Sequence, residues 1–159
     1  MAKYSKFLME HFQNPRNVGE ISNPDAVGIV ANASCGDIMQ MFIKVNGNRI
    51  SQAMFKTFGC GAAIATSSIL TERIKGSTID EALEISERIS KEILSELPKE
   101  KIPCFNLAAN ALKVAIEEYR CKQVRFLQKE ESDFAKKVDK NNITAKEENF
   151  FLQKPFLDD

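Results

Sequence analysis

The sequence has no long hydrophobic run and no excess of charge of one sign. Its 159 residues carry 22 Lys+Arg and 22 Asp+Glu, so no global field attracts nucleic acid or an anionic membrane. No apolar run approaches the ~20 residues that a membrane span needs. The N-terminal stretch mixes charged and apolar residues and has no small-residue cleavage site, so we expect no signal peptide. These absences predict a soluble, cytoplasmic protein without nucleic-acid or membrane partners.

Histidine and cysteine are also scarce. The only histidine is His11, and the four cysteines are Cys35, Cys60, Cys104 and Cys121. An even cysteine count can indicate disulfides, but nothing points to secretion, and the chain is long enough to bury a core without such cross-links. In a reducing compartment, dispersed cysteines indicate metal binding, catalysis or plain burial.

Alternating hydrophobicity predicts an antiparallel hairpin. Apolar and polar residues alternate over residues 37–45, and Asn46 with Gly47 supplies a two-residue turn signal. A second strand follows over residues 49–58, and a shorter strand is expected over residues 26–34.

Helical spacing of apolar residues predicts four helices. The first ends before Pro15, and the second covers residues 62–74. The third starts at a capping signal at residues 77–78, residues 87–97 either continue it or restart a helix, and Pro98 ends it. The fourth begins at Cys104 and has a clean apolar stripe. The first helix carries Tyr4, Phe7, Leu8 and Phe12 at helical spacing, and the stripe of the fourth consists of Leu107, Ala108, Ala111, Leu112, Ala115, Ile116 and Tyr119.

The composition changes after residue 123. Residues 124–159 are highly charged and end in the aromatic stretch FFLQKPFL. We therefore expect one domain over residues 1–123 and a C-terminal extension, helical or partly disordered, over residues 124–159. The aromatic tip is either a solvated tail or a partner-docking motif, and the sequence leaves both open.

Three of the cysteines stand at the ends of predicted elements. Cys35 lies in SCGD before a strand, Cys60 in FGCGAA between strand and helix, and Cys104 at a helix start. Amides at a helix N-terminus lower the pKa of a thiol below its usual ~8.5, and we expect this for Cys60 and Cys104. Asp37 can add an oxygen ligand. Three thiolates and a carboxylate suit zinc or an iron–sulfur cluster, while three buried cysteines packed as small hydrophobes remain the alternative.

Over residues 3–123 the chain resembles the IscU/NifU-type iron–sulfur cluster assembly scaffold family. The resemblance rests on HFQNPRNVG, SCGDIM, AMFKTFGCGAAIATSS, KGSTIDEAL and LPKEKIPC followed by LAANALKVAIEEY. It implies an α+β fold of the IscU/SufE-like type, in which a three-stranded antiparallel sheet packs against helices. It also implies that the three cysteines gather at one end of the molecule.

The resemblance assigns roles to five residues. Cys35, Cys60 and Cys104 match the cluster ligands, and Asp37 matches an aspartate that tunes cluster lability and can bind metal. Cys104 also matches the acceptor of persulfide sulfur, and Lys101 is the lysine beside it, whose charge offsets negative charge building up there.

The sequence departs from the family in two places. Pro103 stands where relatives have a histidine ligand, so Asp37, solvent or a partner group would be the fourth ligand. The chaperone-recognition element is LPPVK in the family and LPKEK here, which weakens the expectation of an Hsp70-type chaperone as partner. His11 matches a non-ligand histidine and is interpreted as structural or surface, and Cys121 as a bystander thiol.

The resemblance implies a scaffold, not an enzyme in the ordinary sense. Such a protein accepts sulfur from a cysteine desulfurase, binds iron, builds a transient [2Fe–2S] cluster and passes it to apo iron–sulfur proteins. Zinc is a further metal that these ligands would hold. The alternative is a zinc-dependent sulfurtransferase like the SufU branch, which usually carries an insertion before the last cysteine that is missing here.

Overall fold

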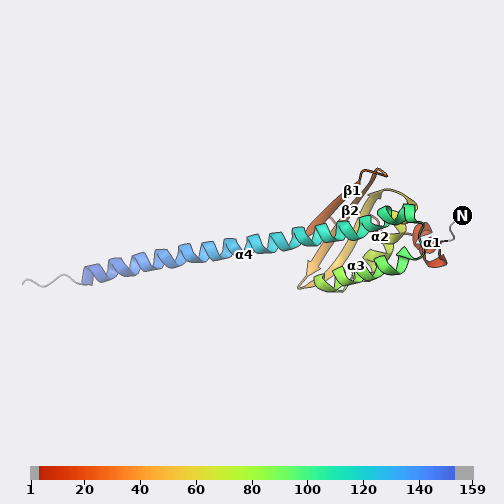
Figure 1. Ribbon diagram of the computed structural model, residues 1–159. Coiled ribbons are helices and arrows are strands. Elements are labelled where there is room, and N and C mark those ends of the chain that lie inside the picture. Colours follow the sequence, from red (N-terminus) through yellow and green to blue (C-terminus); the bar gives the residue numbers. More distant parts are fainter. Residues whose placement is uncertain (1–3, 153–159) are drawn as a thin grey trace, which may run out of the picture. The chain divides into compact units, whose positions relative to one another are not determined.

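A three-stranded antiparallel sheet with helices packed against it forms the body of the protein (Figure 1). The computed structural model describes the backbone of residues 4–152 and the side chains of residues 4–140. The strands are β1 (Ala26–Asn32), β2 (Asp37–Asn46) and β3 (Arg49–Phe58), in spatial order β1-β2-β3. The helices are α1 (Lys6–Gln13), α2 (Gly61–Ile74), α3 (Ile79–Leu94), the short 3₁₀ helix η1 (Lys99–Lys101) and α4 (Ile102–Leu152). The predicted α+β fold is confirmed.

The central hairpin forms as its sequence pattern predicts. The turn between β2 and β3 places Gly47 at a φ of 62°, a conformation in which glycine has no steric penalty. On β2, Met39, Met41 and Ile43 are fully buried on one face, because successive side chains of a strand point to opposite sides. This buried face carries the helices.

The helix starts follow the capping signals. Thr78 precedes α3 and accepts a hydrogen bond from the backbone N–H of Glu81, whose side chain in turn accepts one from the backbone N–H of Thr78. The helix α4 begins two residues earlier than predicted, at Ile102, and its predicted stripe is buried from Leu107 to Ile116. On α1 the expected apolar face is only partly buried: Leu8 is covered, whereas Phe7 is 49% and Phe12 42% exposed.

Strand β1 and helix α4 approach each other at backbone distance. A Cβ placed on Gly28 would lie 2.6 Å from the backbone nitrogen of Ala115, so only glycine fits at this point of the strand. The backbone N–H of Val27 donates a hydrogen bond to Glu118 Oε2 at 2.6 Å. The part of α4 over residues 111–118 is therefore held close against the strand.

The other edge of the sheet is bonded to the segment after α1. The backbone N–H of Phe55 on β3 donates to the carbonyl of Asn17 at 2.9 Å, and the N–H of Gly19 donates to the carbonyl of Phe55 at 2.8 Å. Asn17 has a φ of 61°, which asparagine tolerates better than most residues. This segment thus continues the sheet by one short bridge.

The chain divides into two compact units, residues 1–120 and 121–159. Helix α4 spans the junction and extends through Leu152. In the part of the chain that the structure describes, no helix has the length and apolar character to span a membrane. Most of the FFLQKPFL tip lies outside the described residues.

Candidate metal centre

Three of the residues predicted to bind metal converge at one end of the sheet. Cys35, Asp37 and Cys104 each offer a ligand atom, and these three atoms lie within 4.8 Å of one another. The sulfur atoms of Cys104 and Cys35 are 3.7 Å apart. A pair of thiols and a carboxylate at this spacing can share one cation or cluster.

The turn between β1 and β2 positions two of the three. Gly36, with a φ of 72°, lets the chain reverse there, and its N–H donates to the carbonyl of Asn32 at 2.8 Å. Cys35 is exposed on this turn. Asp37 opens β2 on the same face as Met39 and is 7% exposed. Cys104 comes from the first turn of α4, so the set joins a loop, a strand and a helix.

Cys60 lies beside this set of three. It is the N-cap residue of α2, and its backbone N–H faces Asp37 Oδ2 at 3.4 Å. Its thiol is close enough to that of Cys104 to raise the pKa of Cys104. Asp37 thus contacts the loop that carries Cys60 while its carboxylate faces the other two cysteines. All four predicted ligands belong to one neighbourhood.

The expectation of a lowered pKa for Cys104 is wrong. Burial, followed by the neighbouring thiols of Cys60 and Cys35, raises the pKa of Cys104 to about 12. Cys104 is 4% exposed, and loss of hydration opposes the thiolate more strongly than the helix amides favour it. In the metal-free protein the thiol keeps its proton at neutral pH, so a binding cation has to displace that proton.

Lys101 shares a pocket with Cys60. The pocket has a volume of about 300 Å³ and is mostly apolar, with Lys101 at the end of η1 as its cation. Its wall consists of Tyr4, Leu8, Met9, Phe12, Cys60, Gly61, Ala62, Ala65 and Lys101. The predicted supporting charge is thus placed on the Cys60 side of the site.

Pro103 lies in the first turn of α4, and its side chain is exposed. Proline has no backbone N–H, and it fits here because N–H groups in the first turn of a helix make no hydrogen bond within the helix. A proline ring offers no donor atom to a metal. Among the residues whose side chains the structure describes, the compact ligand set contains only Cys35, Asp37 and Cys104. Cys121, in the second unit, is exposed and is not a member of that set.

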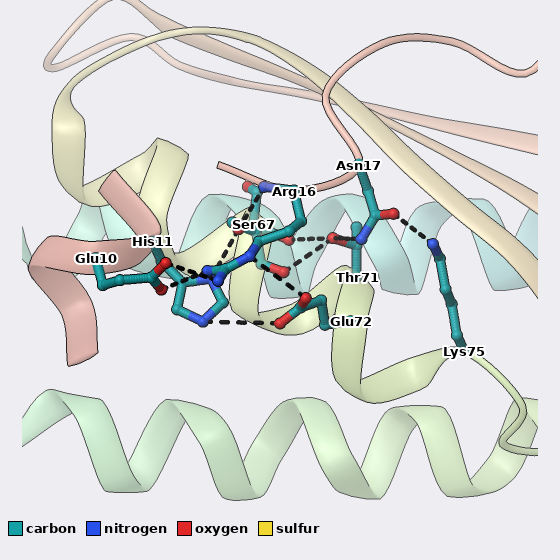
Figure 2. A network of polar contacts seen from close by, with 9 residues as sticks. Glu10, His11, Arg16, Asn17, Ser67, Thr71, Glu72 and Lys75 are labelled. Carbon is teal, nitrogen blue, oxygen red and sulfur yellow. Dashed lines mark hydrogen bonds and ion pairs between the residues drawn. The ribbon is translucent and has the colours of Figure 1, made fainter. Parts of the chain in front are cut away.

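His11 serves a different purpose, at the contact between α1 and α2 (Figure 2). The residue is 3% exposed, which rules out the surface interpretation and supports the structural one. Its Nδ1 lies 2.8 Å from Ser68 Oγ and 3.2 Å from Arg16 Nη1, and its Nε2 faces a carboxylate oxygen of Glu72 at 3.7 Å. Because arginine can only donate, Nδ1 acts as an acceptor and the ring proton belongs on Nε2.

This network joins α1 and the turn that follows it to α2, which lies far from both in sequence. The guanidinium of Arg16 donates to both carboxylate oxygens of Glu10, at 2.5 and 2.7 Å, and its backbone N–H donates to Ser68 Oγ at 2.9 Å. Asn17 donates to Thr71 Oγ1 and accepts from Lys75. The turn after α1 is thereby held onto α2, whose first residue follows Cys60.

The folded protein is expected to lose stability as the pH falls through about 6.5. Burial, and then the charge of Arg16, lowers the pKa of His11, so the folded state keeps the ring neutral where the unfolded chain takes up a proton. The unfolded state then binds more protons, and the free energy of unfolding falls by up to about 1.4 kcal/mol per pH unit. Urea titrations at several pH values measure this slope. His11→Gln should flatten it, and an equally steep slope in that variant would contradict the assignment.

Sequence reasoning missed two features of this site. The first is the link from the Asp37 carboxylate to the Cys60 amide; the alternation of β2, which puts Asp37 on the buried face with Met39, was an available signal. The second is the polar network under α1, for which the hydroxyl-rich stretch over residues 66–68 in an otherwise apolar helix was the signal.

Known proteins similar to this chain share its core. A family model described as the NifU-like N-terminal domain matches residues 3–126. The iron–sulfur cluster assembly scaffold protein IscU 1 of Archaeoglobus fulgidus is 56% identical over 116 residues, which cover 73% of this chain and 76% of that protein. The scaffold protein IscU of Buchnera aphidicola subsp. Schizaphis graminum is 50% identical over 124 residues, covering 76% of this chain and 96% of that protein. The N-terminal part of a nitrogen-fixing NifU-like protein from Brucella abortus has the same fold, with a TM-score of 0.64 at 21% identity over 74% of this chain and 94% of that one.

Proposed function

The chain belongs to the NifU-like N-terminal domain family, and on this premise we propose that it is a scaffold on which an iron–sulfur cluster is built and from which the cluster is passed on. The convergence of Cys35, Asp37 and Cys104, with Cys60 beside them, is the observation that carries this proposal. The relatives named as scaffold proteins support it.

The ligand set suits a cluster that is bound transiently and then transferred. Cys35 is exposed on a glycine-containing turn, so the cluster would be reached from outside, and because Pro103 supplies no ligand, one of the four ligands would be a carboxylate. Soft thiolates bind iron strongly, whereas one carboxylate is a weaker ligand for a cluster iron. We assign Cys35, Asp37, Cys60 and Cys104 as ligands of a transient [2Fe–2S] cluster. Zinc would compete for the same donors.

Cys104 is assigned as the sulfur acceptor, with a cysteine desulfurase as donor. Its sulfur attacks the outer sulfur of the donor's persulfide, and a new S–S bond forms on Cys104 as the donor's S–S bond breaks. The donor leaves as a thiol with the proton that Cys104 gives up. Turning the transferred sulfur into bridging sulfide takes two electrons from an external dithiol reductant. The cation of Lys101 would offset negative charge at this end of the site.

The remaining parts of the proposal concern setting and partners. The protein acts as a carrier and not as an enzyme in the ordinary sense, since the cluster is its product and its cargo. Recipients are apo iron–sulfur proteins, and LPKEK at residues 97–101 makes an Hsp70-type chaperone a weaker candidate partner. A cytoplasmic location, where thiols stay reduced, fits four cysteines without a disulfide among the described residues.

Anaerobic reconstitution tests the proposed function. The full chain is incubated with Fe²⁺, cysteine, a purified desulfurase and a dithiol, and visible absorption and metal content are measured. We expect a thiolate-to-iron chromophore that is lost when apo-ferredoxin is added and appears on the ferredoxin. Cys121→Ser should behave as the parent chain does. Stoichiometric zinc with stimulation of the desulfurase but no cluster would overturn the scaffold and favour a sulfurtransferase.

A further inference from the structure

The second unit of the chain has an apolar seam along one side of α4. Val124, Leu127, Phe134 and Val138 form this seam, and their side chains are 53%, 58%, 70% and 41% exposed. Their spacing of three, seven and four residues matches the a and d positions of a heptad repeat, with Glu131 at the remaining a position. Such a stripe on a helix is the pattern that packs against another helix.

We propose that two copies of this chain pair through this seam as an antiparallel helical dimer. A helix that keeps four large apolar side chains this exposed gains little from tertiary packing, and helical stability in proteins comes mostly from packing of an apolar face. A second copy presents the same stripe over the same length, so the two seams match without any further component.

The charges on the helix select the antiparallel orientation. In a parallel pair in register, each Glu131 would face the Glu131 of the other copy at an a position, which places two like charges at the contact. In an antiparallel pair, Glu131 instead lies opposite Phe134 of the second copy, and Leu127 lies opposite Val138. Glu130 and Lys137, which flank the seam, then approach each other across the interface from both copies. Opposite charges at such flanking positions set partner choice and orientation.

The seam is too narrow to favour a lipid surface. Helices that lie on membranes have a broad apolar face and a strongly basic polar face. Here the apolar stripe is interrupted by Glu131 and bordered by Glu130 as well as Lys137, so charges of both signs reach its rim. A second helix with complementary charges can pair with charges of both signs at the rim, whereas an anionic membrane would repel the side chains of Glu130 and Glu131.

A matched pair of substitutions tests the seam in the full chain. Phe134 lies on the seam and Phe126, which is 59% exposed, lies on a different side of the same helix. We expect the parent chain to show a concentration-dependent monomer–dimer equilibrium in sedimentation experiments. Phe134→Gln should weaken the dimer by about tenfold or more, because each dimer loses two buried rings, whereas Phe126→Gln should leave it unchanged. Circular dichroism checks that both variants stay folded.

A charge swap tests the orientation. Glu130→Lys and Lys137→Glu should each weaken the dimer and make it stronger at high salt relative to low salt, because like charges then meet. The double variant should restore the parent affinity. In a parallel pair residues 130 and 137 would not meet, so neither single variant would weaken the dimer in this salt-dependent way. The proposal is overturned if the chain stays monomeric at all concentrations, if Phe126→Gln weakens a dimer as much as Phe134→Gln does, or if self-association needs a purified desulfurase. Loss of cluster assembly without loss of the dimer would count against the proposed function alone.

Discussion

Replacing Cys104 with serine is expected to abolish persulfide acceptance and to reduce cluster yield to the level of a protein-free mixture. The serine hydroxyl has nearly the same size, so the buried position stays filled, but it neither attacks a persulfide nor binds iron as a thiolate does. Mass spectrometry after incubation with the desulfurase and cysteine measures the expected gain of one sulfur atom on the parent chain and its absence on the variant.

Two other cysteines separate the acceptor role from the ligand role. Cys35→Ser should still gain sulfur on Cys104 but fail to hold a cluster, because it loses a ligand and keeps the acceptor. Cys121→Ser should do both as the parent does, since Cys121 is exposed and lies in the second unit. A Cys104→Ser chain that still carries the extra sulfur would show that the acceptor has been assigned to the wrong residue.

The largest loss of stability is expected from Gly28→Ala. The added methyl carbon would lie 2.6 Å from the backbone nitrogen of Ala115 and closer still to the carbonyl of Ala111, and backbone atoms of a helix cannot turn aside as a side chain can. Strand β1 and helix α4 would have to separate, which should lower the free energy of unfolding by about 3 kcal/mol. Urea denaturation followed by circular dichroism measures the change.

Gly47→Ala is the matched control for this effect. Gly47 has a positive φ of 62° and nothing within 4 Å of an added Cβ, so its substitution should cost only the backbone strain, about 1 kcal/mol. If both variants lose the same stability, the close approach of β1 to α4 does not limit the residue at position 28.

The elements of the fold could be predicted because their signals are local. Alternation over β2, the turn at Asn46 and Gly47, and the capping pair Thr78 and Glu81 each act within a few residues, and each is present in the structure. The residues of the site could also be named, because cysteines at the ends of elements and the family resemblance pointed to them.

What could not be predicted depends on contacts between distant segments. The raised pKa of Cys104 results from burial beside thiols that come from other elements, and nothing in the sequence around α4 reports that burial. The covering of His11 follows from the Arg16 turn folding onto Ser68, which lies 57 residues after His11 and 52 after Arg16. The sequence around His11 leaves both a structural and a surface interpretation open, because it does not report this burial.

The bonds at the two borders of the sheet have a consequence for aggregation. A three-stranded sheet has two open edges, and an edge strand with free amides can recruit a strand from another molecule. Here Glu118 occupies the N–H of Val27 on one border, and Asn17 and Gly19 bond to Phe55 on the other. These bonds occupy backbone groups on both border strands, so a strand from another molecule finds fewer unpaired groups there with which to extend the sheet.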